Sequence, residues 1–486
     1  MDRRKASLLI AGGALGGLGI LAIPYLGSSG VRIVGFPTLP VFDETAAQIV
    51  PANAKVATEL ARTYNIKVKI HPELRILCRT ADAVSTLVQW AREHDIPFAI
   101  RSGGHCFAGH SQHRRLVIDL REMQYVEINQ QQQIVSVGSG QHIGPLHRLL
   151  AKAGFGIPAG VCPDVAIGGH VLGGGIGYAS RQSGLLCDQL QSLEQVNAQG
   201  QLVLASNEQN EDLFWGSRGG GGNLGIVTRF TFSLRKLTQL NVISIHRRLS
   251  TKDTAQLLAD WQEWSQRQPF GTTTHIKITK YPTGGMLVSF TGQSTEPRDR
   301  LVMAMAGIFA GTVPDFERDI TTGSPIEALA KEPEGGNLPG VYEFVQHELL
   351  RQALDLDQCL ALLEILESHI VNGAYLFFEP LDGAVNDVAA DATAFPHRGK
   401  AVFIVQCSTT IDNIFQREER LAGVLAVKAF MQPFSTGGAY VNYPDADLEN
   451  PAQAYWGDNL PRLSAIKRKY DPDNMFRHRQ GIPLDR

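Results

Sequence analysis

The sequence predicts a fold that combines helices and strands and is divided into more than one domain. At 486 residues the chain exceeds the usual length of a single domain, about 100–200 residues. A strand, an amphipathic helix and a second strand follow one another between residues 75 and 101. Glycine-rich clusters interrupt the chain up to about residue 225, and from about 236 amphipathic helices alternate with strand-like runs. This change of pattern predicts a domain boundary near residue 235.

The first part of the chain, residues 45–235, contains the strand–helix–strand pattern. Residues 75–78 and 97–101 are expected to be the strands, and apolar residues recur at helical spacing between 84 and 91. The further elements expected in this part are strands at 116–119, 134–138 and 226–232 and a helix at 142–153.

The second part, residues 236–435, is expected to form a separate domain, followed by a C-terminal segment at 436–486. Its sequence pattern predicts alternating helices and strands, and it contains no glycine clusters. The expected helices lie at 253–264, 298–310 and 357–370, and the expected strands lie at 275–279, 286–291 and 401–407. The C-terminal segment carries aromatic and polar motifs and ends with an expected helix at 460–470.

Residues 1–30 have the pattern of an export signal or N-terminal anchor. Arg3, Arg4 and Lys5 precede an apolar run from residue 6 to 23 that contains several glycines. Adjacent arginines before a weakly apolar run are similar to a twin-arginine signal, which predicts a periplasmic or extracellular location. The run is also long enough to stay as an anchor, so membrane attachment through the N-terminus is an alternative.

Charge, hydrophobicity and cysteine content exclude several classes of protein. Lysine and arginine number 45 against 48 acidic residues, for a net charge of −3, so no nucleic-acid partner is expected. A hydrophobic content of 43% excludes a mainly disordered chain. The six cysteines are scattered without a CxxC pair, which argues against a disulfide scaffold or a cysteine-rich zinc site.

The glycine clusters at 101–111, 160–177 and 216–225 predict places where the backbone approaches a ligand closely. Successive N–H groups in such turns bind anions, and a pyrophosphate is the expected guest. No cluster satisfies the dinucleotide fingerprint, which needs a preceding strand, a following helix and an acidic residue about 20 positions later. Histidines at 105, 110 and 113 lack the helical spacing of a metal-binding pair, so no metal is expected. A glycine-rich turn without any ligand is the alternative.

Cysteine 162 occupies one of these loops, between Gly160 and Pro163. Cys78 and Cys407, by contrast, lie in apolar runs, as is typical of buried structural cysteines. The placement of Cys162 therefore indicates a role outside the packed core.

Eight sequence segments, read in order, carry a more specific signal. They are RSGGH at 101–105, GVCPDV at 160–165, GGHVLGGGIG at 168–177, SGLLCDQL at 183–190, SRGGGGNLGIVT at 217–228, TAFPHRG at 393–399, AYVNYPDAD at 439–447 and YWGDNLPRLSAIKRKYDPDNMF at 455–476. Together they resemble the berberine-bridge-enzyme-like flavoproteins of the vanillyl-alcohol-oxidase superfamily. The resemblance covers residues 73–482, nearly the whole chain beyond the N-terminal segment.

The resemblance implies an α+β fold. The FAD-binding domain would be of the two-part vanillyl-alcohol-oxidase type, completed by the C-terminal segment. The substrate domain would carry an antiparallel sheet covered by helices. FAD would be attached covalently twice, through His105 to the flavin 8α-methyl group and through Cys162 to flavin C6. The other implied cofactor contacts are Arg101, Ser102, Gly103, Gly104, Gly109, Val165, Gly168, Gly169, Gly174, Gly225, Ile226, Tyr440 and Asn442.

The resemblance also implies catalytic residues. Tyr443 matches a general base of several relatives, and because a phenol has an unperturbed pKa near 10 it needs neighbours to act near neutrality. Gln406 matches a position that faces the flavin, where an amide can orient a substrate hydroxyl without taking its proton. Alternatives are a purely structural Tyr443 and an acidic base elsewhere in the central domain. Val165 resembles a gatekeeper of oxygen access, at which valine is associated with oxidases.

Two departures from the family restrict the substrate. Cys106–Phe107 replaces a frequent Asp-Tyr pair, and Ile176 replaces a frequent tyrosine, so the aromatic substrates of the plant enzymes are not carried over. The expected function is FAD-dependent oxidation of a CH–OH group in a sugar or hydroxylated metabolite, with O2 as acceptor and H2O2 as product. A dehydrogenase with another acceptor and a flavin-binding scaffold without turnover are the alternatives.

Overall fold

The computed structural model describes residues 32–281, 283–309, 315–329, 343–369, 374–410 and 417–484. The expected export segment, residues 1–30, lies outside these ranges. Among the helices within them, none combines the length and apolarity needed to cross a lipid bilayer.

The strand–helix–strand pattern near the N-terminus is confirmed. A four-stranded sheet has the order β1-β2-β4-β3, in which β2 and β3 both run parallel to β4 and β1 is antiparallel to β2. Helix α2 connects β2 to β3 and is capped by the Thr80 hydroxyl, which accepts the N–H of Ala83. The bounds are β1 (Ala47–Pro51), β2 (Leu74–Cys78), α2 (Ala81–Glu93), β3 (Phe98–Arg101) and β4 (Leu116–Asp119).

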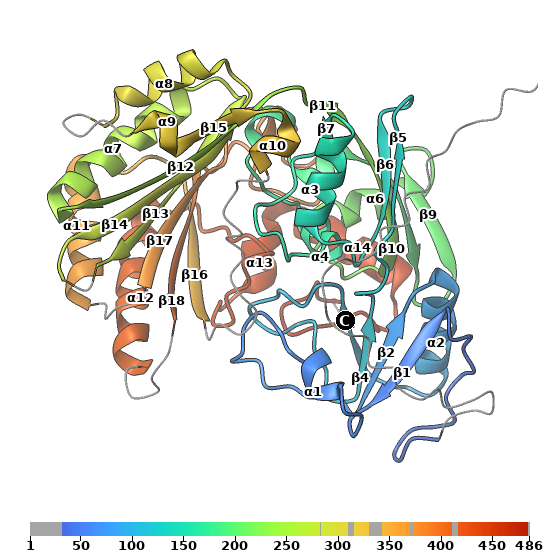
Figure 1. Ribbon diagram of the computed structural model, residues 1–486. Coiled ribbons are helices and arrows are strands. Elements are labelled where there is room, and N and C mark those ends of the chain that lie inside the picture. The colour runs from blue at the N-terminus through green and yellow to red at the C-terminus, as the bar shows by residue number, and fades with distance from the viewer. Residues whose placement is uncertain are drawn as a thin grey trace, which may run out of the picture.

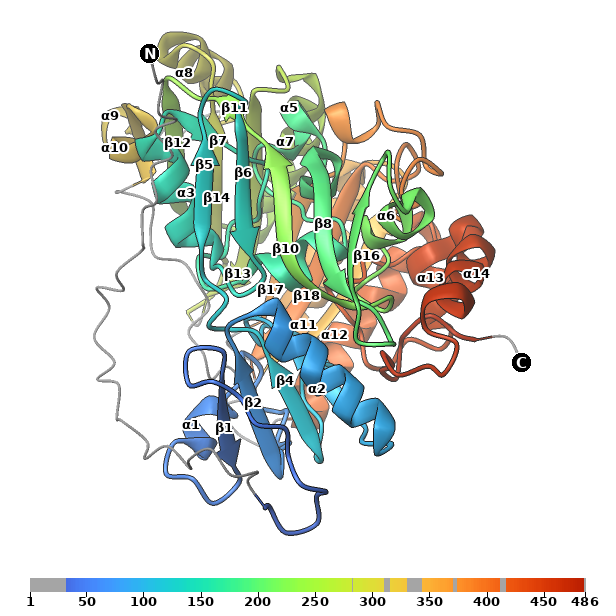
Figure 2. The same ribbon diagram turned by 90° about the vertical axis from the view of Figure 1, so that its right-hand side faces the viewer.

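A second, antiparallel sheet follows in the order β5-β6-β10-β8-β9. Figure 2 shows it above the first sheet, with α6 at its side. Its strands are β5 (Val126–Asn129), β6 (Ile134–Gly138), β8 (Leu190–Val196), β9 (Leu202–Ser206) and β10 (Ile226–Ser233). Its helices are α3 (Ile143–Lys152), α4 (Ile167–Leu172), α5 (Ser180–Ser183) and α6 (Glu211–Ser217), and short β7 (Phe155–Gly156) pairs with β11 (Arg235–Lys236).

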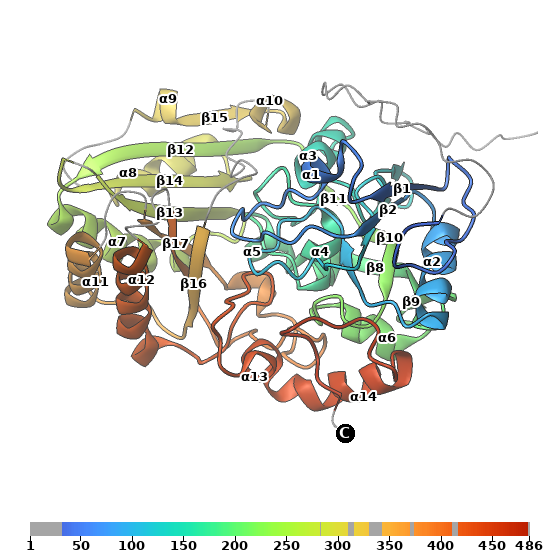
Figure 3. The same cartoon turned by 90° about the horizontal axis from the view of Figure 1, so that it is seen from below.

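The central part of the chain forms a seven-stranded antiparallel sheet in the order β15-β12-β14-β13-β17-β18-β16. One of its faces is covered by α7, α11 and α12, on the side away from the rest of the molecule (Figures 1 and 3). The strands are β12 (Leu240–Leu249), β13 (Thr272–Lys280), β14 (Met286–Ser294), β15 (Ile320–Gly323), β16 (Glu343–Leu350), β17 (Ala374–Pro380) and β18 (Phe403–Thr410). The covering helices are α7 (Thr251–Arg267), α11 (Leu356–His369) and α12 (Arg417–Met431).

The other face of this sheet is polar. Strand alternation places Ile276, Phe378 and Val405 in the core beneath the helices. Their neighbours in sequence therefore point to the opposite side. Along one row of paired positions these are His246, Ser289, Lys277, Phe377, Gln406 and His347. This polar face is turned toward the part of the chain that carries the glycine clusters (Figure 1).

The C-terminal segment returns to the first part of the chain. Helices α13 (Pro451–Trp456) and α14 (Leu460–Tyr470) lie beside α6 in Figure 2. The Trp456 indole N–H donates to the carbonyl of Gly219 at 3.1 Å, and the buried Lys467 ammonium donates to the carbonyl of Asn223 at 2.7 Å. The segment thereby fixes the third glycine cluster. The domain boundaries near 235 and 435 stay a prediction.

Some expected elements differ in extent from the observed ones. The helix expected at 298–310 is α8 (Arg298–Ala306), which ends at Gly307, a residue that favours helix termini. The strand expected at 401–407 begins later, at Phe403, and runs to Thr410. The remaining short helices are α1 (Ala57–Leu60), α9 (Phe316–Asp319) and α10 (Pro325–Leu329).

Candidate active site

The glycine-rich loops meet the segment that carries Tyr443. The backbone N–H of Gly175 donates to the Tyr440 hydroxyl at 3.0 Å, and the Asn442 amide donates to the carbonyl of His170 at 2.8 Å. A Cβ atom at Gly173 would lie 2.2 Å from the Asn442 side chain. Close approach of these two segments therefore needs glycine, and it brings the predicted contacts Tyr440 and Asn442 against the second cluster.

His105 and the Cys162 loop are neighbours. The His105 ring stacks on Tyr64 with centroids 4.1 Å apart, and its Nε2 atom lies 3.7 Å from Asp164 Oδ1. Within the described structure, neither of these two buried atoms has a hydrogen-bond partner. Cys162 is half-buried, and the N–H of Val165 donates to its carbonyl at 3.2 Å in a tight turn. The structure thus places His105, one predicted tether, against the loop that carries the other, Cys162.

The glycines of the first two clusters allow backbone to pack on backbone. A Cβ atom at Gly103 would lie 2.9 Å from Ala166, and one at Gly168 would lie 2.9 Å from both Ser102 Oγ and the Ser139 carbonyl. Gly169, in contrast, has no atom within 4 Å of the same position. This mixture of tight and open glycine positions suits a loop that lies against a flat ligand.

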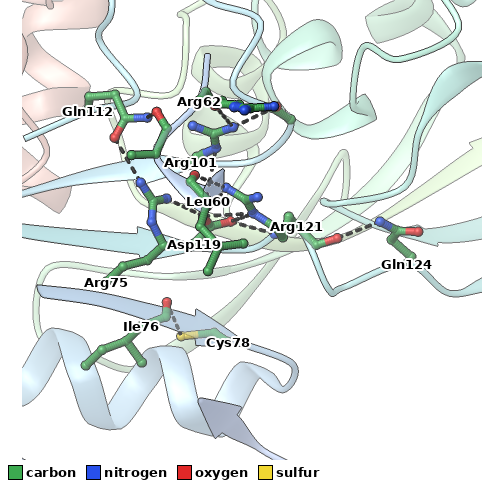
Figure 4. A network of polar contacts seen from close by, with 12 residues as sticks. Leu60, Arg62, Arg75, Ile76, Cys78, Arg101, Gln112, Asp119, Arg121 and Gln124 are labelled. Carbon is green, nitrogen blue, oxygen red and sulfur yellow. Dashed lines mark hydrogen bonds and ion pairs between the residues drawn. The ribbon is translucent and has the colours of Figure 1, made fainter. Parts of the chain in front are cut away.

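A cluster of three arginines, Arg75, Arg101 and Arg121, surrounds the buried carboxylate of Asp119 (Figure 4). Arg75 and Arg121 both donate to the carboxylate of Asp119, and Arg101 Nε lies 3.8 Å from the same carboxylate. The Arg101 guanidinium also packs against Gly104, where a Cβ atom would lie 2.3 Å from it. Burial lowers the pKa of Arg101 to about 9, so the group stays protonated near neutral pH.

The cluster has more positive than negative charge. Its three guanidinium groups face one carboxylate, and Nε and Nη1 of Arg101 lack hydrogen-bond partners among the described residues. A buried donor without an acceptor is costly, and a diphosphate would supply both acceptors and negative charge. The orphaned donors, the glycine turn above them and the His105–Cys162 pair all fit an FAD molecule.

The predicted base has an acidic partner. The Tyr443 hydroxyl donates to Glu379 Oε2 at 2.8 Å, and the Gln406 amide donates to the same oxygen at 3.4 Å. Glu379 is only 2% exposed. Burial raises the pKa of Glu379 to about 7, although the hydrogen bonds from Tyr443 and Gln406 oppose that rise. Burial and the nearby Glu379 charge raise the pKa of Tyr443 well above its usual value.

Tyr443 also lies next to the predicted tethers. Its ring is 6.2 Å from that of Phe107, two residues after His105, and 5.0 Å from that of Tyr440. The charge of Cys162 contributes to the raised pKa of Tyr443, which reflects their proximity. The loops that carry the predicted tethers therefore lie close to the predicted base Tyr443, although more than 250 positions separate them in the sequence.

Four other predicted contacts, Ile226, Gly225, Gly109 and Val165, pack against other parts of the chain. The Ile226 side chain is fully buried, so only its backbone is placed to meet a ligand. Gly225 packs on the Gln195 amide, and Gly109, at φ +79°, packs on Val68. Val165 is half-buried against the core of the first part. The roles of these residues stay predictions.

The three histidines of the first cluster have separate environments. His110 stacks on His478 with centroids 4.3 Å apart, and His113 Nδ1 accepts the N–H of Arg115. Only His105 faces the Cys162 loop. The three imidazoles therefore have different partners.

Sequence reasoning named Arg101 as a cofactor contact but missed Glu379 and the other members of the arginine cluster, Arg75, Asp119 and Arg121. Glu379 follows Phe377 and Phe378 in the otherwise apolar strand β17, and a carboxylate in such a run is the signal that could have found it. Asp119, likewise, ends the apolar strand β4. Both are buried acids that have partners in distant segments, Tyr443 for Glu379 and Arg75 and Arg101 for Asp119.

Comparisons with known proteins agree with this geometry. A family model described as an FAD binding domain matches residues 72–206, and one described as berberine and berberine like matches residues 439–483. The chain is 33% identical over 446 residues to YvdP of Bacillus subtilis, named an uncharacterized FAD-linked oxidoreductase, covering 88% of this chain and 96% of that protein. It is 26% identical to a chitooligosaccharide oxidase of Gibberella zeae, covering 86% of this chain and 89% of that protein.

Solved structures share the fold. Berberine bridge enzyme from Eschscholzia californica superposes with a TM-score of 0.82 at 22% identity, over 90% of this chain and 97% of that one. A chitooligosaccharide oxidase superposes with a TM-score of 0.79 at 23% identity, over 90% of this chain and 98% of that one. At these identities the likeness concerns the fold alone.

Proposed function

The chain belongs to the berberine-bridge-enzyme-like family of FAD-linked oxidoreductases, and from this premise we propose that it oxidises a CH–OH group of a small molecule. The proposed cofactor state is FAD attached covalently through both His105 and Cys162. The proposed electron acceptor is O2, and the products are a carbonyl compound and H2O2. The observation that carries the proposal is the hydrogen bond from Tyr443 to the buried Glu379.

Through this hydrogen bond, Glu379 becomes the final acceptor of the proton that an alcohol hydroxyl loses. The Tyr443 oxygen takes the proton from the substrate hydroxyl while its own proton passes to Glu379 across the hydrogen bond, whose two oxygens are 2.8 Å apart. The raised pKa of Glu379, about 7, suits a group that accepts a proton near neutral pH. FAD, when bound, supplies the acceptor for the hydride that leaves the carbon and for the electrons that pass on to O2. The Gln406 amide donates to the same Glu379 oxygen as the phenol does, and its own oxygen remains to orient the substrate hydroxyl.

The polar face of the seven-stranded sheet supports a hydroxylated substrate. Ser289, Lys277 and Phe377 are half-buried on the row that leads to Gln406. Hydroxyl and ammonium groups can hydrogen-bond to substrate hydroxyls, and an aromatic ring can pack on the face of a sugar or similar ring. A sugar or a hydroxylated metabolite is therefore the proposed substrate class, and the chitooligosaccharide oxidase among the relatives is in keeping with it.

We also propose that the chain is exported. The basic start and the apolar run at residues 6–23 support this proposal. The proposed location is periplasmic or extracellular. The alternative is that the N-terminus attaches the protein to a membrane. Detection of the protein in fractionated cells, with and without residues 1–30, tests the proposal.

Anaerobic titration with a panel of alcohols tests the function. The panel includes glucose, cellobiose, N,N′-diacetylchitobiose and a benzylic alcohol, and bleaching of the bound flavin is followed by absorbance. The proposal expects at least one sugar to bleach the flavin, and readmitted air to restore the colour with release of H2O2. A flavin that dithionite reduces but no alcohol bleaches would contradict the oxidase proposal and favour a scaffold. Bleaching without reoxidation in air would instead favour a dehydrogenase.

A further inference from the structure

The short stretch that carries the proposed base is held by side chains. Residues 440–445, here called the Tyr443 segment, belong to no helix or strand of the described structure. Within the segment, the N–H of Tyr443 donates to the carbonyl of Tyr440 at 2.9 Å. Because no helix or strand hydrogen bonds hold this segment, the position of the Tyr443 phenol depends on contacts to neighbouring elements.

Strand β16, at the edge of the seven-stranded sheet, makes two of these contacts through adjacent residues. The N–H of Tyr440 donates to His347 Nε2 at 2.7 Å, and the His347 ring meets the Tyr443 ring edge-on at 6.0 Å. Burial lowers the pKa of His347 to about 4, so the imidazole is neutral and accepts this bond near neutral pH. His347 therefore fixes the start of the segment.

Gln346 points to the other side of β16 and fixes the end of the segment. Its amide donates to Asp445 Oδ1 at 2.9 Å, and Lys428 on α12 donates to Asp445 Oδ2 at 2.8 Å and to the Gln346 oxygen at 2.6 Å. Asp445 is 2% exposed and Gln346 is equally buried. Gln346, Asp445 and Lys428 therefore form a triangle in which each side chain is hydrogen-bonded to the other two. The Lys428–Asp445 bond joins two opposite charges.

The triangle also reaches the loop of the proposed His105 tether. The Asp445 carbonyl accepts a hydrogen bond from the Gln480 amide at 2.5 Å, and His110 Nε2 donates to the Gln480 oxygen at 3.1 Å. His110 follows His105 by five residues. Asp445 thus joins α12, β16 and the first glycine cluster at a point two residues from Tyr443.

We propose that Lys428, acting through Asp445 and Gln346, is a positioning residue that sets the Tyr443 phenol against Glu379. This inference rests on the proposed function, because it concerns the same proton transfer. Lys428 is outside the site and touches none of the reacting groups described above. Without its ammonium, the buried Asp445 carboxylate keeps the Gln346 amide and the N–H of Asp447 as donors to Oδ1 but loses the charged donor to Oδ2, and the end of the Tyr443 segment loosens. A shift of about 1 Å between reacting groups can slow a reaction by about 10²-fold.

Hydrogen exchange and reduction kinetics of the flavin-loaded protein test the proposal together. In Lys428→Met we expect the amides of residues 439–447 to exchange at least several-fold faster. We also expect the limiting rate of flavin reduction to fall by about 10-fold or more, with little change in the apparent substrate Kd. The substrate is the sugar of the panel that bleaches the flavin fastest. Lys428→Arg keeps the charge and should restore both properties in large part.

A matched control separates positioning from general stability. Lys400→Met removes a surface ion pair with Asp458 and should change neither the exchange of residues 439–447 nor the reduction rate. Unchanged exchange and a reduction rate within twofold of wild type in Lys428→Met would overturn the proposal. If Lys428→Met does not accumulate with flavin, Gln346→Met, which removes the other side chain on Asp445, is judged by the same criteria.

Failure of this inference can be told from failure of the proposed function. If Tyr443→Phe slows reduction but Lys428→Met does not, only the positioning role is wrong. If Tyr443→Phe leaves reduction unchanged, the proposed base is wrong. The exchange of residues 439–447 then still decides whether Lys428 holds the segment, because that measurement needs no substrate.

Discussion

The phenol of Tyr443 donates a 2.8 Å hydrogen bond to the carboxylate of Glu379, which is almost completely buried. Neither group alone suits the proposed chemistry. The phenol has a pKa well above its usual value, and the carboxylate by itself faces a tyrosine rather than open solvent. In the proposed reaction the pair relays a proton from a substrate hydroxyl to Glu379, whose pKa burial raises to about 7.

The first prediction concerns the bond between protein and cofactor. We expect acid-precipitated protein to keep its yellow colour, because both tether residues are present and adjacent loops carry them. His105→Ala or Cys162→Ala alone should leave one covalent bond, and the double variant should release its flavin into the supernatant. A colourless wild-type pellet would contradict double attachment.

The second prediction concerns the arginine cluster. Arg101→Met should reduce the amount of FAD retained per protein molecule, because it removes the unpaired donors beneath the glycine turn. Arg75 and Arg121 still neutralise Asp119, so we expect the variant to fold. Flavin absorbance relative to protein absorbance measures the effect. Arg229→Met, at a surface ion pair with Glu127, serves as control and should load FAD as wild type does.

The third prediction concerns the electron acceptor. Val165 lies in the turn that follows Cys162, so added bulk there would narrow the space beside the flavin. We expect Val165→Leu to slow reoxidation by O2 in stopped-flow measurements while anaerobic reduction by substrate stays nearly unchanged. Equal reoxidation rates in the two proteins would count against a gatekeeper role.

The fourth prediction concerns the proposed base. Tyr443→Phe keeps the aromatic contacts with Tyr440 and Phe107 but removes the hydroxyl. We expect flavin reduction by substrate to slow by about 10²-fold or more, as is typical when a general base is lost. The content of bound flavin should not change. Reduction at the wild-type rate would move the base to another residue.

Candidate tethers and a candidate base could be named from the sequence because each lies in a short local motif, and their roles stay predictions. His105, Cys162 and Tyr443 all stand within such motifs. Glu379 could not be predicted in the same way, since its role appears only when β17 meets a segment 64 positions away. Asp119 gathers arginines from two neighbouring strands and a loop for the same reason.

Strands could be predicted from the sequence only where their own residues form an apolar or alternating pattern. Apolar runs such as those of β2 and β4 were expected, since they are buried along their length. Strand β8, with the sequence LQSLEQV, mixes polar and apolar residues and was not expected. Its identity as a strand depends on pairing with β10 and β9, which no local window contains.

The pH dependence of flavin reduction tests the central claim most directly. Burial raises the pKa of Glu379 to about 7, and its charged form is the one that accepts the phenol proton. The limiting rate of anaerobic reduction by substrate should therefore rise with pH, level off above about pH 7, and fall toward acid pH as Glu379 becomes protonated. Glu379→Gln keeps the shape of the side chain but cannot take a proton, so its rate should be about 10-fold or more lower at pH 8 and should lose the inflection near 7. A Glu379→Gln protein that retains the wild-type rate and the same inflection would contradict the Tyr443–Glu379 relay.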